Sequence, residues 1–182
     1  CENLLSKNNN EKAITFVSEN GFREERTWKS LYINVANIVQ FLNQIKIKKG
    51  ERIVAYMPNC IETVEAFLAT SSIGAIWSSC SPDFGINGVV ERFSQIKPKV
   101  MFISDQYFYN GKKIKIIERL PKILKLIPSI KYVIVINYPG KKFIKSNLRL
   151  KNKKLFKWSS LIKKNYQKIN FKRYDFENEL AI

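Results

Sequence analysis

Residues 51–80 read ERIVAYMPNCIETVEAFLATSSIGAIWSSC, and this stretch decides the fold. It opens with a nearly all-apolar run at 52–56, passes through an amphipathic segment to Gly74, and closes with a second apolar run at 75–78. Continuous apolar runs bounded by turn residues are typical of strands that are buried on both faces. The stretch therefore predicts strand, helix and strand, which is the unit of a parallel sheet.

The segment between the two apolar runs carries the signals of a helix. Asn59 precedes Glu62 by three residues, a spacing like that of a capping box. Glu62 and Glu65 both lie in this helix, and we expect them to serve as helix-capping and solvent-facing residues instead of an acid–base pair. The apolar side of the helix is Ile61, Val64 and Leu68.

The sequence before this stretch predicts a hairpin and a helix. Residues 13–17 and 22–26 read as two short strands around a turn at Asn20-Gly21, and Thr27 is placed to cap the helix that follows. The turn at 48–51 ends that helix. Its apolar stripe is Leu31, Val35, Ile38, Leu42 and Ile45.

The sequence after this stretch repeats the alternation. A helix with apolar residues from Ile86 to Ile96 is followed by a strand at 100–103, a helical segment at 114–127 and a strand at 132–136. Pro121 predicts a break in the helical segment. We therefore expect an α/β fold, with a mostly parallel sheet and helices on both faces.

Beyond Gly140 the periodicity weakens. Residues 141–173 are rich in lysine and predict a variable connection between structured parts. They contain one short amphipathic helix, made of Trp158, Leu161, Ile162 and Tyr166. Residues 176–182 turn apolar again, as if a strand were beginning, which suggests a chain that is cut instead of finished.

The net charge of +17 is concentrated in one part of the chain. Residues 119–173 hold 17 of the 32 Lys and Arg residues and no Asp or Glu. Such a block could attract nucleic acid or an anionic membrane. A solvated, lysine-rich surface explains it better, so we expect neither nucleic acid nor membrane as a partner, with a basic polyanion-binding module as the alternative.

Histidine is absent from the sequence, which excludes Ser-His-Asp chemistry, Cys-His chemistry and the common zinc sites. The three cysteines, Cys1, Cys60 and Cys80, are odd in number and widely spaced, so they predict neither disulfides nor a metal centre. The apolar runs are far shorter than the ~20 residues of a membrane-spanning helix. These features favour a soluble protein of the cytoplasm.

The motif search predicts no catalytic residue and no metal ligand. Neither a Gly-x-Gly-x-x-Gly nor a Gly-x-x-x-x-Gly-Lys-Ser/Thr pattern occurs. The loop 78–85 follows a predicted parallel strand, where open α/β sheets bind ligands, but its Ser, Pro, Asp and Gly residues would equally build a turn. Cys80 in this loop reads as a packed residue. Arg92, on the next helix, could hold a phosphate or simply be solvated beside Glu91.

Residues 72–85, SIGAIWSSCSPDFG, resemble the acetoacetyl-coenzyme A synthetases, a family within the adenylate-forming acyl-coenzyme A synthetase superfamily. The motifs MPN at 57–59, RFSQIKPK at 92–99 and YNGK at 109–112 follow in the family's order, and the resemblance covers about residues 10–140. Acetyl- and propionyl-coenzyme A synthetases usually carry a Gly-Gly-Phe-Ser-Pro-type loop where this chain has Cys80 to Phe84.

The resemblance implies a two-step ligase that activates acetoacetate with magnesium ATP to an acyl-adenylate and transfers the acyl group to coenzyme A. It aligns Arg92 with an arginine that contacts a phosphate of coenzyme A. Acetoacetate or a similar short acyl acid, such as acetate or propionate, is the implied substrate.

The resemblance also implies an architecture. Residues 1–182 would form the incomplete N-terminal part of an AMP-binding domain, with 141–173 as the variable connection and without a C-terminal domain. The phosphate-binding loop of the family would follow the strand that Leu180-Ala181-Ile182 begins. We therefore expect this piece to be inactive by itself and to work with the remainder of the same polypeptide.

Overall fold

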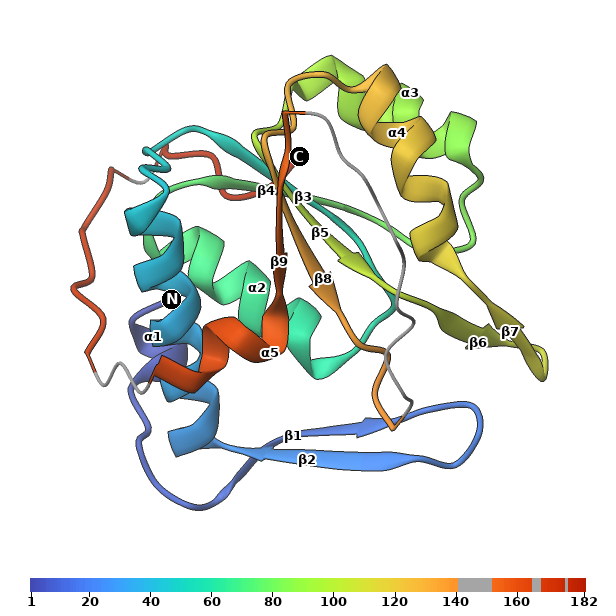
Figure 1. Cartoon of the computed structure of the whole chain (residues 1–182). Helices are drawn as coiled ribbons and strands as arrows, with labels where there is room; N and C mark the ends of the chain where they lie inside the picture. The colour runs from blue at the N-terminus through green and yellow to red at the C-terminus, as the bar shows by residue number, and fades with distance from the viewer. Residues whose placement is uncertain (141–151, 165–167, 176) are drawn as a thin grey trace.

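A five-stranded parallel sheet forms the centre of the computed structural model, which describes residues 1–140, 152–164, 168–175 and 177–182 (Figure 1). The strand order is β4-β3-β5-β8-β9, so β3 lies between its two sequence neighbours. All neighbouring pairs are parallel. The strands are β3 (Arg52–Tyr56), β4 (Ile76–Cys80), β5 (Val100–Ser104), β8 (Tyr132–Ile136) and β9 (Lys154–Lys157).

Helices cover both faces of this sheet. The helices α1 (Trp28–Gln44), α2 (Ile61–Ser72) and α5 (Trp158–Leu161) pack on one face, and α3 (Ile86–Ile96) and α4 (Leu120–Leu126) pack on the other (Figure 1). Successive residues of β3 divide between the two cores, because side chains alternate along a strand. Ile53 and Ala55 belong to the first core, and Val54 and Tyr56 to the second. The predicted α/β class with helices on both faces is confirmed.

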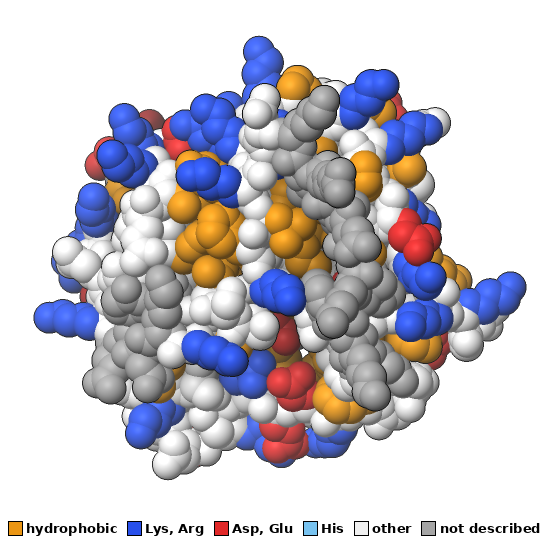
Figure 2. All heavy atoms as spheres, in the orientation of Figure 1, with side chains coloured by type: hydrophobic (Ala, Val, Ile, Leu, Met, Phe, Trp, Pro, Cys, Tyr) orange, Lys and Arg blue, Asp and Glu red, His pale blue; other side chains and the backbone are white. Residues whose placement is uncertain are grey.

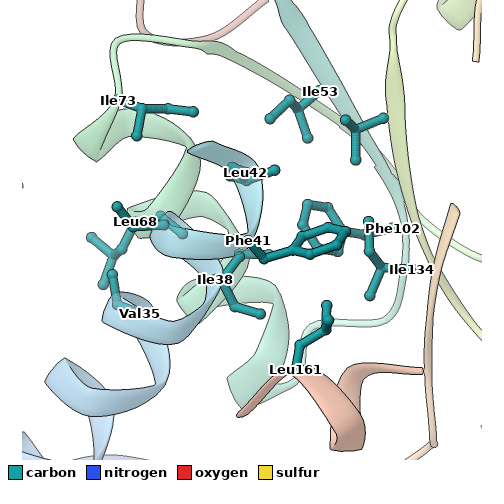
Figure 3. Packing of buried hydrophobic residues seen from close by; sticks show 14 of the residues in the cluster. Val35, Ile38, Phe41, Leu42, Ile53, Leu68, Ile73, Phe102, Ile134 and Leu161 are labelled. Carbon is teal, nitrogen blue, oxygen red and sulfur yellow. The ribbon is translucent and has the colours of Figure 1, made fainter. Parts of the chain in front are cut away.

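The core under α1 is built from the stripe that the sequence predicts. Ile38 and Leu42 are fully buried and point from α1 toward Phe102 and Ile134 of the sheet (Figure 3). Leu161 of α5 closes the same cluster. Burying one such side chain stabilises the fold by roughly 1.5–3 kcal/mol. The packing of α1 and α5 on β5 and β8 is therefore a main source of stability.

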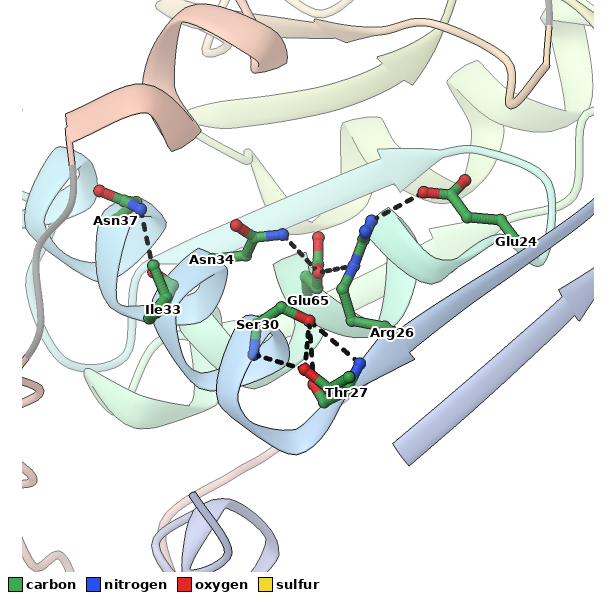
Figure 4. Close-up of polar contacts among 8 residues, drawn as sticks. All are labelled: Glu24, Arg26, Thr27, Ser30, Ile33, Asn34, Asn37 and Glu65. Atoms are coloured by element: carbon green, nitrogen blue, oxygen red, sulfur yellow. Dashed lines mark hydrogen bonds and ion pairs between the residues drawn. The ribbon is translucent and has the colours of Figure 1, made fainter. Parts of the chain in front are cut away.

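The N-terminal hairpin leads directly into α1. Its strands β1 (Lys12–Val17) and β2 (Arg23–Thr27) pair antiparallel, as predicted. Thr27 then caps α1: its hydroxyl accepts a hydrogen bond from the Ser30 amide at 3.2 Å, and the Ser30 hydroxyl accepts one from the Thr27 amide at 3.0 Å (Figure 4). The predicted cap is confirmed, with Ser30 completing a capping box.

The predicted capping box of α2 is wrong. The helix begins at Ile61 with Cys60 as its N-cap, and no side chain caps it. Asn59 is one residue too early to reach the free amides of the first turn and lies exposed. Thr63 instead turns back, and its hydroxyl donates to the Pro58 carbonyl at 2.7 Å.

The expectation that Glu62 and Glu65 face solvent is also wrong. Glu62 is only 9% exposed and Glu65 is completely buried. The hairpin supplies the partner that makes this possible, because Arg26 Nε donates to Glu65 Oε1 at 2.9 Å (Figure 4). Asn34 Nδ2 of α1 donates to the same oxygen at 2.8 Å. A single carboxylate therefore ties the hairpin, α1 and α2 together.

Burial dominates the acid–base behaviour of this cluster. It raises the pKa of Glu65 to about 8, although Arg26 and Asn34 favour the ionised carboxylate. Burial also raises the pKa of Glu62, whose neighbour Glu24 adds to the effect. Glu24 in turn forms an ion pair with Arg26 Nη2 at 3.2 Å. Arg26 thus pairs directly with two carboxyl groups and acts electrostatically on a third, that of Glu62.

Some elements are not predicted by the sequence pattern. After β5 the chain forms a hairpin of β6 (Tyr107–Tyr109) and β7 (Lys112–Ile114), then a 3-10 turn η2 (Ile116–Arg119). Pro121 lies in the first turn of α4. The break that the sequence predicts at this proline is therefore the start of a helix. Two further 3-10 turns are η1 (Asn3–Leu5) and η3 (Ile162–Lys164).

The lysine-rich part contributes the outer strand β9, which lies within the predicted connection 141–173. Trp158 and Leu161 are buried, and Ile162 is half-buried, which fits the predicted amphipathic helix. Tyr166 lies outside the described residues. None of the helices in the described parts of the chain is long and apolar enough to cross a membrane.

The last described residues pair with the outer edge of β4. The Trp77 amide donates to the Leu180 carbonyl at 3.0 Å, and the Ile182 amide donates to the Trp77 carbonyl at 2.9 Å. Ala181 forms a parallel bridge with Trp77. The strand-like character that the sequence predicts for this segment is present.

Replacing the cap of α1 tests its contribution. Thr27→Ala removes the hydroxyl that accepts from the Ser30 amide, so we expect the free energy of unfolding to fall by about 1 kcal/mol. Thr27→Ser keeps the hydroxyl and should stay close to the wild type in urea denaturation. Equal losses in both variants would contradict the cap assignment.

The buried cluster predicts a pH dependence of stability. Because the pKa of Glu65 is raised from 4.5 to about 8, the folded protein keeps a proton that the unfolded chain releases between these pH values. Stability therefore falls as the pH rises through this window, at no more than about 1.4 kcal/mol per pH unit for this group.

Urea denaturation at pH 5 and pH 8 measures the effect. The loss of stability between the two pH values should be smaller in Glu65→Gln than in the wild type, since Glu24, Glu62 and Arg26 remain in both proteins. Glu25→Gln is the control, because the lowered pKa of the exposed Glu25 keeps it ionised across the window. An identical pH dependence in Glu65→Gln and the wild type would show that Glu65 does not bind this proton.

Candidate functional site

The topology of the sheet places a candidate site at the carboxyl ends of β3 and β5. From β3 the chain passes through α2 to β4 on one side, and from β5 it passes through α4 to β8 on the other (Figure 1). Ligands of open α/β sheets bind in the crevice where the connections part in this way. The loop 81–85, between β4 and α3, lies at this edge.

Two side chains from neighbouring elements hold the backbone of this loop. The hydroxyl of Tyr56, the last residue of β3, has one proton and shares it between the carbonyls of Pro82, at 3.1 Å, and Phe84. Arg119 Nη1, at the end of η2, donates to the same two carbonyls at 3.1 Å and also bonds the Tyr56 hydroxyl. Burial raises the pKa of Tyr56, so the phenol keeps its proton.

Asp83 holds the loop from its other side. One carboxylate oxygen accepts from the Ser81 hydroxyl at 2.8 Å, and the other accepts from the Tyr107 hydroxyl at 2.9 Å. Burial and the nearby Asp83 carboxylate raise the pKa of Tyr107 to about 12. β3, η2 and β6 thus all contact the loop, which gives it one defined conformation.

The loop presents an aromatic ring to solvent, and α3 places a cation over it. Phe84 is 39% exposed, and the Arg92 guanidinium lies over its ring at 5.0 Å from the centroid. Arg92 is exposed on α3. Burial raises the pKa of the Cys80 thiol, an effect that Arg92 opposes. Cys80 therefore remains a packed thiol, in keeping with the sequence analysis.

A small cavity adjoins the loop at the same edge of the sheet. Its volume is about 220 Å³, and its lining comes from the ends of β3 and β4 and the start of α2. The lining residues are Met57, Pro58, Asn59, Thr63, Ser79, Cys80 and Ser81. A larger hollow of about 480 Å³ lies at the opposite edge, beside Lys131 and Lys153. The position of the smaller cavity at the carboxyl edge makes it the better candidate.

The sequence identifies part of this arrangement. It places the loop 78–85 at the carboxyl end of a strand and Arg92 on the following helix, and the structure brings Arg92 onto Phe84 of that loop. It misses Tyr56, Tyr107 and Arg119. Tyr56 carries a readable signal, since it ends a predicted parallel strand, whereas nothing in the sequence links Arg119 to the loop.

Comparison with known proteins identifies the family. The family model described as "AMP-binding enzyme" matches residues 3–165. The chain belongs to the AMP-binding enzyme family. The described α/β structure corresponds to the N-terminal part of the adenylate-forming enzyme fold of that family.

Individual relatives in the family share substantial sequence identity. The acetoacetyl-CoA synthetase of Xenopus tropicalis is 45% identical over 140 residues, covering 76% of this chain and 21% of the relative. The acetoacetyl-coenzyme A synthetase of Rhizobium meliloti (strain 1021) is 40% identical over 140 residues, covering 77% of this chain and 21% of the relative. The chain therefore spans about a fifth of the length of these curated relatives.

A solved structure agrees with this assignment. The acetoacetyl-CoA synthetase from Streptomyces lividans superposes with a TM-score of 0.84 at 28% sequence identity, covering 94% of this chain and 25% of that one. The similarity thus extends over nearly all of the present chain. It confirms the sheet, the helices on both faces and the family.

Proposed function

We propose that the protein carrying this sequence is an acetoacetate–coenzyme A ligase of the AMP-binding enzyme family. The observation that carries the proposal is the 40–45% identity to acetoacetyl-CoA synthetases of a vertebrate and a bacterium. The solved acetoacetyl-CoA synthetase with the same fold supports it. The specific sequence SSCSPDFG at 78–85 forms the end of β4 and the loop at the candidate site.

The proposed reaction has two steps. The acetoacetate carboxylate displaces pyrophosphate from ATP, with magnesium bound to the nucleotide, to give an acyl-adenylate. The thiol of coenzyme A then attacks the acyl carbon, releases AMP and gives the thioester. The proposal includes a reducing compartment such as the cytoplasm, which suits three cysteines that form no disulfide in the described structure.

In this proposal, residues 1–182 supply the N-terminal part of the AMP-binding domain, with 141–173 as a variable connection around β9. The described residues form the scaffold that carries the loop 81–85 and the adjoining cavity. The remainder of the same polypeptide supplies the grip on the ATP phosphates and the chemistry. By itself, this region should not complete either step.

Arg92 is proposed to bind a phosphate of coenzyme A. Its guanidinium is exposed and lies over the exposed ring of Phe84, so a cation and an aromatic surface adjoin each other at the carboxyl edge. Guanidinium is suited to phosphate, and an aromatic face is suited to a purine base. The residues present therefore fit the nucleotide end of coenzyme A.

Two alternatives remain distinguishable from this proposal. The acid could be another short acyl acid, such as acetate or propionate, because the substrate is inferred from relatives. A basic polyanion-binding module is the second alternative. On the face of the molecule that Figure 2 draws, the Lys and Arg side chains of the described residues are spread out instead of gathered into one patch. The Lys153 ammonium moreover donates hydrogen bonds to the Pro128 and Ile130 carbonyls.

ATP–pyrophosphate exchange tests the proposed reaction. The full-length protein that carries this sequence should exchange pyrophosphate into ATP with acetoacetate, and more slowly with acetate or propionate. Residues 1–182 alone should show no exchange. Faster exchange with acetate or propionate would show that one of these acids, and not acetoacetate, is the substrate. Exchange by residues 1–182 alone would contradict the division of roles within the polypeptide.

Substitution of Arg92 tests the coenzyme A contact. Arg92→Ala should raise the KM for coenzyme A about tenfold, since a hydrogen bond to a charged group contributes roughly 1.5–3 kcal/mol. Thioester formation at varied coenzyme A measures this constant. Arg23→Ala, at an exposed arginine of the hairpin, is the control and should leave it near the wild-type value. An unchanged KM for coenzyme A in Arg92→Ala would show that Arg92 does not bind coenzyme A.

A further inference from the structure

The strongest feature that the proposed function does not use is the grip on the loop 81–85. Two donors from distant parts of the chain, the Tyr56 hydroxyl and Arg119 Nη1, converge on the carbonyls of Pro82 and Phe84. Arg119 Nη1 also donates a hydrogen bond to the Tyr56 hydroxyl oxygen. We call this arrangement, made of Tyr56, Arg119 and the two carbonyls, the loop clamp.

The loop clamp is stronger than an ordinary turn needs. Hydrogen bonds from an ionised donor are about twice as strong as bonds between neutral groups. Arg119 is half-buried, and its described polar contacts all go to the loop and to Tyr56. Tyr56 is completely buried and keeps its phenol proton, so it donates at any neutral pH. The clamp therefore fixes the loop backbone at the two residues that flank Asp83.

Fixing this backbone also fixes the exposed ring of Phe84. On one side the ring lies under the Arg92 guanidinium. The ring also lies against Gly88, one turn earlier on α3, where an added Cβ would be 3.0 Å from the ring. The Phe84 carbonyl belongs to the clamp, so displacement of the clamp would move the ring relative to the Arg92 guanidinium.

We propose that Arg119 and Tyr56 are positioning residues that hold Phe84 and Arg92 in place for coenzyme A. This inference rests on the proposed function, and extends it to residues that do not contact the ligand. The clamp acts on the second substrate. Its loss should therefore affect coenzyme A more than the adenylation of the acid.

The chain contains a matched control at the opposite end of the same strand. Arg52 begins β3, and its guanidinium also binds backbone carbonyls, those of Ile96 at 2.6 Å and Gly50 at 3.1 Å. Arg52→Gln therefore removes the same kind of interaction from the amino edge of the sheet. It reports the cost of losing an arginine–carbonyl contact away from the loop.

The experiment compares four variants of the full-length protein: Arg119→Gln, Arg119→Lys, Tyr56→Phe and Arg52→Gln. Titration calorimetry measures the Kd for coenzyme A, ATP–pyrophosphate exchange measures the first step without coenzyme A, and hydrogen exchange measures the amides of residues 83–86. The last two measurements do not depend on coenzyme A.

We expect Arg119→Gln to weaken coenzyme A binding about tenfold, which is the effect of losing one charge-assisted hydrogen bond between Arg92 and a phosphate of the ligand. The rate of ATP–pyrophosphate exchange should fall by a smaller factor in this variant. The backbone amides of residues 83–86 should exchange their hydrogens faster. Tyr56→Phe should show the same pattern to a smaller extent, and Arg119→Lys should recover part of the affinity. Arg52→Gln should keep its coenzyme A affinity.

Three results would overturn the inference. The first is an affinity for coenzyme A in Arg119→Gln equal to that of the wild type. The second is that both Arg119→Gln and Arg52→Gln lose affinity for coenzyme A and ATP–pyrophosphate exchange in the same proportion. Absence of both exchange and coenzyme A binding in the wild-type protein would overturn the proposed function, and this inference with it. The wild-type measurement thus separates the two failures.

Discussion

Strand β3 is the constraint on which the rest of the structure depends. It is hydrogen-bonded to β4 on one edge and to β5 on the other, and its side chains are buried in both cores. No part of the strand itself can therefore meet a ligand. Its carboxyl end lies beside the loop 81–85, and Tyr56 at that end combines a ring in the core with a hydroxyl bonded to the loop. Both the stability of the sheet and the shape of the site therefore depend on Tyr56.

Buried polar groups connect the outer parts of the molecule to this sheet. Glu65 joins the N-terminal hairpin to α1 and α2, and Arg119 joins the start of α4 to the loop after β4. Both rely on the same physics: a polar or charged group removed from water must find partners at close range. They differ in the partner. Glu65 meets a guanidinium and an amide, whereas Arg119 meets carbonyl dipoles, which impose a direction on the loop.

The sequence predicts the parts of the fold that follow from local periodicity. The strands β3, β5 and β8, the helix α3 and the cap at Thr27 are where the apolar pattern and the capping signals place them. It fails where tertiary contacts decide. The burial of Glu62 and Glu65 depends on a hairpin that is distant in sequence, and a pattern of charges in a helix reads as a solvated face.

The same limit applies to the site and to the outer strand. The loop after β4 and Arg92 are predictable, because parallel strands expose their carboxyl ends and the motif at 72–85 is specific. Arg119 is not, since its role exists only once η2 packs beside the loop. β9 is short and mostly exposed, so it lacks the apolar run that marks the central strands.

The pairing of Trp77 with Leu180 and Ile182 bears on how the chain reaches this structure. These partners are separated by roughly a hundred residues, and closing so large a loop costs entropy before the hydrogen bonds form. During synthesis on the ribosome, the outer edge of β4 must therefore wait for a partner that is translated much later. Until then it is an unpaired edge, and a chaperone that shields it would limit aggregation.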